Sequence, residues 1–348
     1  MNNFNDLKNL ILSGWETVDW RDHGQVNVQE HNGLLLFSYM ATCQFKKPEE
    51  WNWFEQVSRG LVMDAKTGEV VARPFNKFWN YGEAQPSGDI VEITEKVDGS
   101  LGVGFYHGGQ WQICTRGSFE SEQAVWATKF LRENYDLCGV QTEITLLFEI
   151  IYPENRVVVD YGDREDLVLL GIRNTKGKAD WWFSAVKHFA NCNGFKTPPV
   201  YEVEDIDKLL EKAKTLGPEH EGWVVRYSDG TRVKIKGAAY LEIHKWIGKI
   251  TPKNIAKMLY EKKTREYLLD VCPRLLIDEM YNVILDVEGM AADIYTVVCS
   301  LYDEAPKTTR KEYALWAKEQ LPCFQKYLFL HYDDKLSFLD IYKGEFGL

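Results

Sequence analysis

Apolar and polar residues alternate in short runs over the first two thirds of the chain. Segments rich in Val, Ile, Leu, Phe and Tyr recur between residues 34 and 236, with Gly and Asp turns between them. Such runs are typical of strands. The predicted strand segments are 34–40, 59–64, 67–75, 88–99, 102–115, 144–152, 156–161, 167–173, 221–227 and 231–236.

Helical spacing of apolar residues appears in two interruptions and then dominates the end of the chain. Segments 121–135 and 205–216 repeat apolar residues at three- and four-residue intervals, which predicts helices. After residue 236, helices are predicted over 238–250, 253–269, 277–302, 308–320 and 322–331. Thr251 and Pro252 are a helix cap and a first-turn residue. An α+β domain, residues 1–243, is therefore expected before an all-helical domain, residues 244–348.

Composition is consistent with this division. A chain of 348 residues with 45% apolar residues suits two globular domains, and no run of ~18 apolar residues could cross a bilayer. The amino terminus lacks a basic leader and a cleavage site, so no export signal is expected. Seven scattered cysteines without metal or redox spacing indicate reduced thiols. We expect a cytoplasmic protein without a membrane partner.

Charge is unevenly distributed along the sequence. The net charge of −11 disfavours a nucleic-acid partner, because affinity for phosphates comes largely from Lys and Arg. Residues 234–265, however, contain nine basic and two acidic side chains. A solvated helix face and an RNA-backbone contact are both open readings for four lysines that recur there every four residues, Lys245, Lys249, Lys253 and Lys257.

The most informative motif is residues 94–101, TEKVDGSL, in which a strand ends at Lys96 before a tight Asp-Gly turn. A lysine there can reach a phosphate held in a cleft, and it must lose its proton to attack phosphorus. Alone, such a motif is an ordinary hairpin. Five other segments supply the cations, carboxylates and aromatic side chains of a nucleotidyl-transfer site: SRGLV (58–62), RPFNKFWN (73–80), LFEI (147–150), EGWVV (221–225) and VKIK (233–236).

In this order the segments resemble the covalent nucleotidyltransferase superfamily of ATP-dependent ligases and capping enzymes, and most of all the bacteriophage RNA ligase 1 family. The resemblance covers roughly residues 50–250 and includes TRGSFESEQA (115–124) and VKIKGAAYLEIHK (233–245). It implies an antiparallel-sheet nucleotidyltransferase (ATP-grasp-like ligase) domain followed by a helical domain that provides RNA specificity.

The resemblance also implies three phosphoryl transfers. Lys96 would take AMP from ATP with release of pyrophosphate, the AMP would move to an RNA 5′-phosphate, and a 3′-hydroxyl would displace it. Such transfers depend on positioning and charge neutralisation. The implied partner is RNA with 5′-phosphate and 3′-hydroxyl ends, for instance a nicked tRNA anticodon loop undergoing repair. A monomer is expected, in the host cytoplasm if the protein is phage-encoded.

Residue roles follow from positions in the motifs. Lys234 would lie at the α-phosphate and depress the pKa of Lys96, and Gly99 would allow close backbone approach. Glu149 would lie near the ribose and Glu221 near a catalytic Mg²⁺, with Glu149 as a further metal contact, since Mg²⁺ bridges phosphate oxygens and often binds carboxylates through water. The expected contacts to the β- and γ-phosphates are Arg59, Lys77, Lys236 and Tyr240.

Three further positions are less defined. Phe148 is either an adenine platform or a core residue, on the strand face opposite Glu149. Arg116 stands where the family pattern has lysine, and Trp79 stands where it has phenylalanine. Because a guanidinium fork does not replace an ammonium freely, the nucleotide contact of Arg116 is the one least fixed by the resemblance.

Two alternative functions are open from the sequence. DNA ligases and capping enzymes usually continue into a β-barrel after the VKIK-type strand, whereas helices are predicted here. A non-catalytic RNA-binding protein could keep the fold, although both motif lysines and both carboxylates are retained.

Overall fold

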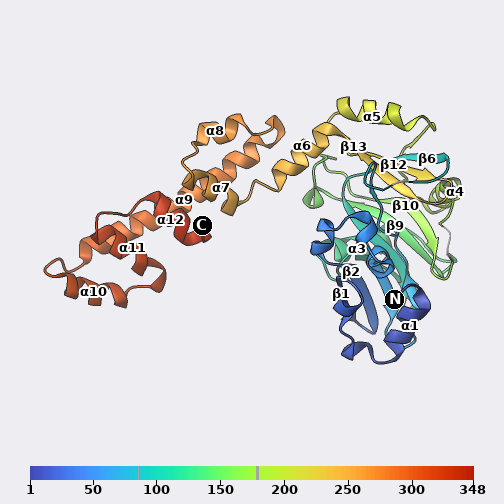
Figure 1. The fold of residues 1–348 in the computed structure, drawn as a ribbon, viewed down its shortest axis with the longest axis horizontal. Coiled ribbons are helices and arrows are strands. Elements are labelled where there is room, and N and C mark those ends of the chain that lie inside the picture. Colours follow the sequence, from blue (N-terminus) through green and yellow to red (C-terminus); the bar gives the residue numbers. More distant parts are fainter. Residues whose placement is uncertain (85, 178–179) are drawn as a thin grey trace. The chain divides into compact units, whose positions relative to one another are not determined.

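A computed structural model describes residues 1–84, 86–177 and 180–348 of the chain. The chain divides into two compact units, Met1–Tyr240 and Leu241–Leu348, close to the predicted boundary. Helix α6 (Ala238–Ile247) runs across it. The first unit contains the strands and the second is helical (Figure 1), so the predicted α+β class is confirmed.

Three sheets form the N-terminal unit, and their strand pairs are antiparallel except for one parallel pair, β5 with β13. The first sheet has the order β1 (Val26–His31), β2 (Leu34–Tyr39), β3 (Arg59–Asp64), β4 (Val70–Ala72). The second has the order β10 (Asp166–Asn174), β9 (Ile144–Ile151), β7 (Ser100–His107), β8 (Gln110–Thr115). The third has the order β11 (Val200–Tyr201), β6 (Ile90–Glu95), β12 (Gly222–Tyr227), β13 (Arg232–Lys236), β5 (Trp79–Asn80).

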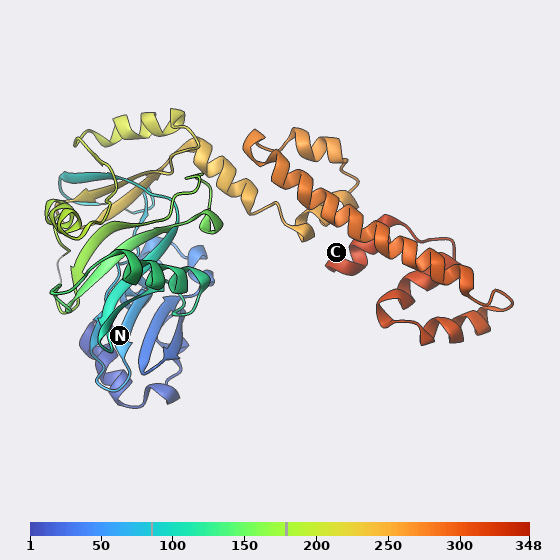
Figure 2. The same cartoon turned by 180° about the vertical axis from the view of Figure 1, so that it is seen from behind.

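Helices cover the outer faces of these sheets (Figures 1 and 2). They are α1 (Phe4–Leu12), α2 (Trp53–Val57), α3 (Glu122–Asn134), α4 (Phe183–Asn193) and α5 (Ile206–Thr215). Apolar side chains of α1 and α2 pack on the first sheet, those of α3 and α4 on the second, and those of α5 on the third. The predicted helices at 121–135 and 205–216 are confirmed, with Ser121 and Asp205 as their caps.

One predicted strand is wrong. Residues 156–161 form no strand, because the amides of Val158 and Val159 donate to the carboxylate of Asp98 at 2.8 and 2.9 Å instead of to a neighbouring strand. Three apolar residues in succession indicated a strand, but a distant side chain takes their hydrogen bonds.

The C-terminal unit contains only helices. After α6 come α7 (Pro252–Tyr260), α8 (Arg265–Asp270), α9 (Ile277–Glu304), α10 (Arg310–Glu319), α11 (Pro322–Tyr332) and α12 (Phe338–Phe346). Thr251 caps α7 as predicted. The single helix predicted over 253–269 is wrong, because Lys262 adopts a positive φ of 63° and Thr264 starts a new helix.

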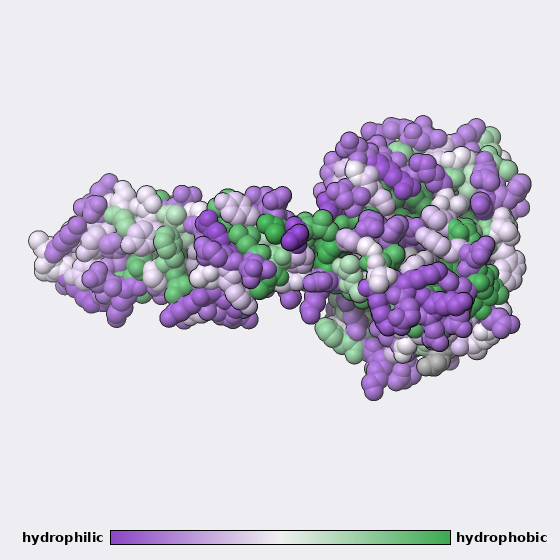
Figure 3. All heavy atoms as spheres, turned by 90° about the horizontal axis from the view of Figure 1, so that it is seen from above, coloured by the Kyte–Doolittle hydropathy of each residue, from purple (hydrophilic) through white to green (hydrophobic). Residues whose placement is uncertain are grey.

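The surface of this unit mixes polar and apolar side chains (Figure 3). Its half-exposed apolar residues include Tyr267, Val271 and Leu275. Among the described residues, no helix is long and apolar enough to span a membrane.

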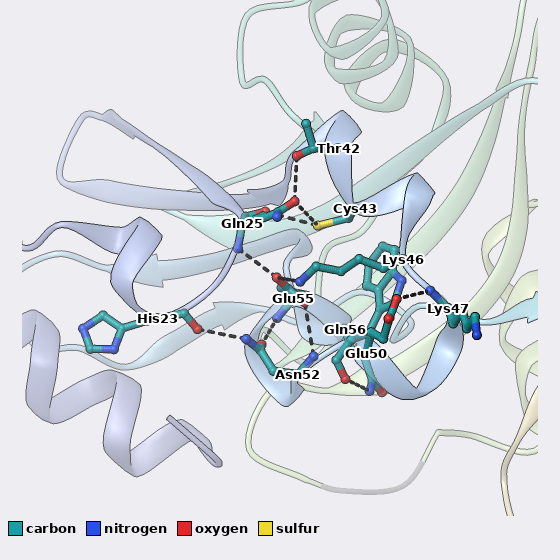
Figure 4. Close-up of polar contacts among 11 residues, drawn as sticks. His23, Gln25, Thr42, Cys43, Lys46, Lys47, Glu50, Asn52, Glu55 and Gln56 are labelled. Carbon is teal, nitrogen blue, oxygen red and sulfur yellow. Dashed lines mark hydrogen bonds and ion pairs between the residues drawn. The ribbon is translucent and has the colours of Figure 1, made fainter.

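A buried polar cluster fixes the loop that leads into β3 (Figure 4). The fully buried carboxylate of Glu55 accepts from the Gln25 amide at 2.8 Å and from Lys46 Nζ at 2.6 Å. Helix α2 and the residue after it then present two carbonyls. That of Gln56 accepts from the Lys77 amide at 2.8 Å, and that of Ser58 accepts from the Tyr39 amide at 2.7 Å. The cluster therefore positions the backbone of two residues beside the site described next.

Candidate active site

Lys96 follows β6 at the place where the third sheet passes to the second. Its amide donates to the carbonyl of Gly222 at 2.8 Å, which ties it to the start of β12. Its side chain is only 21% exposed, and Nζ lies 2.6 Å from a carboxylate oxygen of Glu221. The turn after Lys96 is not a hairpin, because β6 and β7 belong to different sheets, and the fold brings Lys96 directly against Glu221, the carboxylate expected at the same site.

Glu221 holds two of the predicted lysines at once. Its other oxygen lies 2.8 Å from Nζ of Lys236, and its side chain is 2% exposed. Gly222 pairs with Lys236 in the β12–β13 ladder, so the register of this hairpin sets the contact. One buried carboxylate thus pairs with two ammonium groups, so positive charge is in excess beside Lys96.

Lys234 lies on the same face of β13 as Lys236, as predicted, because residues two apart on a strand share a face. Burial, and after it the nearby charges of Lys77, Lys236, Lys96 and Arg59, together lower the pKa of Lys234 to about 7. The sequence pattern assigned a depressed pKa to Lys96 through Lys234. The structure places a depressed pKa on Lys234 itself, since it has several cationic neighbours.

These side chains border a pocket of about 240 Å³ that strands of all three sheets line. Its polar rim contains Lys96, Lys234, Lys236 and Arg59, and its apolar walls include Phe78 and Val224. The Phe78 ring lies 5.3 Å from the Arg59 guanidinium and 6.0 Å from Nζ of Lys234. No individual role was predicted for Phe78, although its motif was recognised. The available signal was an aromatic residue directly after Lys77 in RPFNKFWN.

Glu149 points into this pocket from β9 and is 8% exposed. The pKa of Glu149 is raised to about 8, mainly by burial. The positive charge of Lys96 opposes this rise, whereas the negative charges of Glu221 and Asp98 add to it. Its carboxyl makes no hydrogen bond or ion pair to any residue in the part of the chain that the structure describes. A carboxyl in this position is available to a ligand.

Gly99 permits the contact between the Lys96 turn and β9. A Cβ at this position would lie 2.6 Å from the Ile150 carbonyl oxygen and 3.1 Å from Glu149 Cγ. The close approach predicted for Gly99 is therefore made to the neighbouring strand, at a position that also lines the pocket.

Phe148 is a core residue. It is fully buried among the side chains that pack under α3 and α4, with its ring 5.2 Å from that of Phe195, and it does not line the pocket. The alternative as an adenine platform is wrong, because Glu149 occupies the pocket face of β9 and its neighbour must face the opposite way.

Tyr240 also differs from expectation. It is 2% exposed, and its hydroxyl donates to Asp98 at 2.9 Å, while its ring lies 5.0 Å from Nζ of Lys236. Asp98 accepts two backbone amides with its other oxygen, and its own amide donates to Tyr161 at 3.0 Å. Tyr240 therefore braces the Lys96 turn, and Asp98, the third residue of KVDG, is a site-building residue that the sequence reasoning missed.

A second group of cations gathers around Tyr39. The Arg116 guanidinium lies 4.8 Å from the Tyr39 ring. Burial raises the pKa of Tyr39, but Arg59, Arg116 and Lys77 outweigh it and the net pKa is lowered. Nζ of Lys77 lies 5.3 Å from the Trp51 ring and 5.9 Å from the Trp79 ring. The structure therefore brings the predicted Arg59, Lys77 and Arg116 together, and it adds Tyr39, which no sequence motif indicated.

Mg²⁺ fits this site through few protein ligands. Among the described residues, no group of three or more His, Cys, Asp and Glu side chains could hold a metal ion. Glu149 offers an unpaired carboxyl at the pocket, whereas both oxygens of Glu221 are occupied by lysines. One or two carboxylates supplemented by phosphate oxygens and water is the coordination that Mg²⁺ commonly adopts beside nucleotides.

The chain is similar to several known proteins. An RNA ligase of Rhodothermus phage RM378 is 23% identical over 363 residues, covering 81% of each chain. A protein of Thermovibrio ammonificans named "Putative RNA ligase" is 28% identical over 236 residues, and the match spans 62% of this chain but only 60% of that protein. An archaeal ATP-dependent RNA ligase has a similar fold, with a TM-score of 0.50 at 14% identity over 86% of this chain and 84% of its own. The sequence model of the RNA ligase family matches residues 57–244, more than half of the chain, and the protein therefore belongs to that family.

Proposed function

We propose that the protein is an ATP-dependent RNA ligase that joins 5′-phosphate and 3′-hydroxyl ends through an AMP bound to Lys96. The observation that carries this proposal is the position of Lys96 beside a pocket with Lys234, Lys236 and Arg59 on its rim. A triphosphate carries the negative charge that would balance these cations. Positioned cations also stabilise the negative charge that develops during an in-line phosphoryl transfer.

The ion pair between Lys96 and Glu221 must open for the reaction. An ammonium held by a carboxylate is not a nucleophile, and Nζ of Lys96 lies 2.6 Å from a carboxylate oxygen of Glu221. Binding of ATP adds negative charge, which competes with Glu221 for Lys96 and Lys236. Lys96 then leaves Glu221, loses its proton and forms a bond to the α-phosphorus as pyrophosphate departs. Arg59, Lys77 and Lys236 would hold the departing phosphates.

When bound, Mg²⁺ would supply charge neutralisation at the phosphate oxygens. Glu149 would hold it directly or through water, and Glu221 would join once Lys96 has left its oxygen. The raised pKa of Glu149, about 8, fits a carboxyl that ionises fully only when a cation arrives.

Adenylation of the protein tests the proposal. The wild type incubated with ATP labelled at the α-phosphate and with Mg²⁺ should retain covalent label, and Lys96→Ala should retain none. Lys129→Ala is a matched control, since that lysine is 73% exposed on α3. An unlabelled wild type, or label that persists in Lys96→Ala, would contradict the role of Lys96.

The helical unit would select the RNA, and a nicked tRNA anticodon loop in RNA repair is the substrate that we propose. Lys253 and Lys257 lie one turn apart on α7, and both are exposed. Lys245 and Lys249 do not continue this face, because α6 ends at Ile247 before α7 begins. A helical second unit fits RNA ligation better than DNA ligation or capping. The seven free cysteines are consistent with the reducing cytoplasm, which we propose as the compartment.

Salt dependence distinguishes an RNA-binding face from a solvated one. Changing Lys253 and Lys257 to Gln should reduce the slope of log affinity for a nicked tRNA stem-loop against log salt by about two, without changing adenylation. The control pair, Lys311 and Lys318 on α10, is also exposed. An equal slope for both pairs would leave α7 as a solvated face.

A further inference from the structure

Four arginines line a second cavity next to the nucleotide pocket. This cavity, of about 610 Å³, is bordered by Arg73, Arg173, Arg226 and Arg232 and also by Lys77. Phe75, Phe78 and Arg232 border both cavities, so they form the wall between them.

Positive charge in the arginine cluster exceeds the negative charge available to it. Asp180 lies 2.5 Å from Arg173 Nε and also pairs with Arg232. Arg226 lies 3.6 Å from Glu92 and donates to the Trp181 carbonyl at 3.0 Å. Two carboxylates therefore serve four guanidinium groups.

The remaining carboxylate of the cavity adds one negative charge, which still leaves the cations in excess. Asp229 accepts from the Ser87 hydroxyl at 2.6 Å and from the Thr231 amide at 2.8 Å. Burial lowers the pKa of Arg173 to about 10, with Arg73 and Arg232 adding to the effect and Asp180 opposing it. An excess of partly buried cations is costly to fold unless an anion accompanies it.

The hydrogen bonding of the cluster is also incomplete. The Nε atoms of Arg73 and Arg226 are buried without a hydrogen-bond partner among the described residues, and Arg226 is only 6% exposed. A purely structural network would satisfy these groups, because a buried N–H without a partner costs free energy. The cluster thus has fewer anions than cations, and two of its buried N–H groups have no acceptor among the described residues.

An exposed aromatic side chain stands beside the cations. Trp182, just before α4, lines the same cavity and is 56% exposed. Its ring lies 4.6 Å from the Arg226 guanidinium. Nucleic-acid sites that follow a single strand combine cations for the backbone with aromatic faces for the bases.

We propose that this second cavity binds one nucleotide of an RNA strand, with a phosphodiester at Arg73, Arg226 and Arg232 and the base on Trp182. The inference rests on the proposed function, because it identifies where the nucleotidyltransferase unit itself holds RNA. A strand in this cavity would lie one side chain away from the nucleotide pocket, since Phe75, Phe78 and Arg232 separate the two. It would therefore be near the phosphate to be activated.

Two variants separate the backbone contact from the base contact. Arg226→Gln removes a cation, and Trp182→Ala removes the exposed ring with little risk to folding. Both should weaken binding of a single-stranded 12-nucleotide RNA by about fivefold or more, measured by fluorescence anisotropy. Arg226→Gln should also lower the salt slope by about one, whereas Trp182→Ala should leave it unchanged. For an abasic 12-nucleotide strand, the loss in Trp182→Ala should disappear.

Controls separate this proposal from the adenylation proposal. Arg156→Gln changes another paired arginine of the same unit, which lines a different cavity, and should bind RNA as the wild type does. Label transfer from ATP should be unchanged in Trp182→Ala. Wild-type RNA affinity and salt slope in both cavity variants, with wild-type adenylation, would overturn the RNA site alone. Absence of adenylation in the wild type would overturn the proposed function instead.

Discussion

Replacing Lys234 by arginine should remove a pH dependence of ATP binding that the wild type displays. With a pKa of about 7, Lys234 is charged in about half of the molecules at pH 7 and in roughly a tenth at pH 8. A bound triphosphate stabilises the charged form, so binding takes up a proton. Affinity should therefore be constant below about pH 6 and fall by up to about tenfold per pH unit above pH 7, until the pKa of the complex is reached.

Calorimetry with the α,β-methylene analogue of ATP measures this uptake directly, because the analogue cannot transfer AMP. Titrations in two buffers of different ionisation enthalpy should give about 0.9 proton per nucleotide at pH 8, about 0.5 at pH 7 and about 0.1 at pH 6. Lys234→Arg keeps its charge throughout, so its uptake should be smaller by these amounts, and the ionisation of the nucleotide itself cancels in the difference. Lys77→Met removes one neighbouring cation and should move the midpoint to higher pH. Equal uptake by wild type and Lys234→Arg at pH 8 would refute the reasoning.

Three other predictions concern the support of the site. Glu149→Gln should raise the melting temperature relative to wild type at pH 8 and much less at pH 5. The reason is that a carboxyl whose folded pKa is raised loses its stabilising contribution as pH rises toward 8. A difference in melting temperature that does not vary with pH would contradict this. Tyr240→Phe should lower the free energy of unfolding, measured by chemical denaturation, by only about 1 kcal/mol, because Asp98 keeps its two amide donors. An unchanged denaturation midpoint would show that the hydroxyl contributes nothing. Glu55→Gln should lower the free energy of unfolding by roughly 2 kcal/mol at pH 7 and by less below pH 4. The reason is that Lys46 and backbone donors outweigh burial and lower the pKa of Glu55. An equal loss at both pH values would exclude the charge as the cause.

Local pattern was enough to locate the centre of the site. Lys96, Glu221, Lys234 and Lys236 occupy strand ends or alternate positions of one strand, and strand geometry then decides which of them share a face. The same rule separated Glu149 from its neighbour on β9. These residues could be predicted because short-range backbone geometry determines their direction.

Contacts between distant segments could not be predicted in this way. Asp98 takes the amides of Val158 and Val159, so an apolar run that indicated a strand became a loop. Tyr240 faces Asp98 rather than a phosphate because it is buried. The arginine cavity joins side chains more than 150 positions apart in sequence, from Arg73 to Arg232, and no local period records such a meeting.

The charge arrangement around Glu221 also decides which amine of the site reacts most readily with electrophiles. Electrophiles such as aldehydes and anhydrides react with neutral amines, and Lys96 is engaged with a carboxylate at 2.6 Å while Lys234, with its pKa of about 7, is substantially neutral at physiological pH. In the resting protein the residue that we propose as the nucleophile is thereby shielded from adventitious modification. Lys234 is the amine that a covalent inhibitor directed at this pocket would find ready to react.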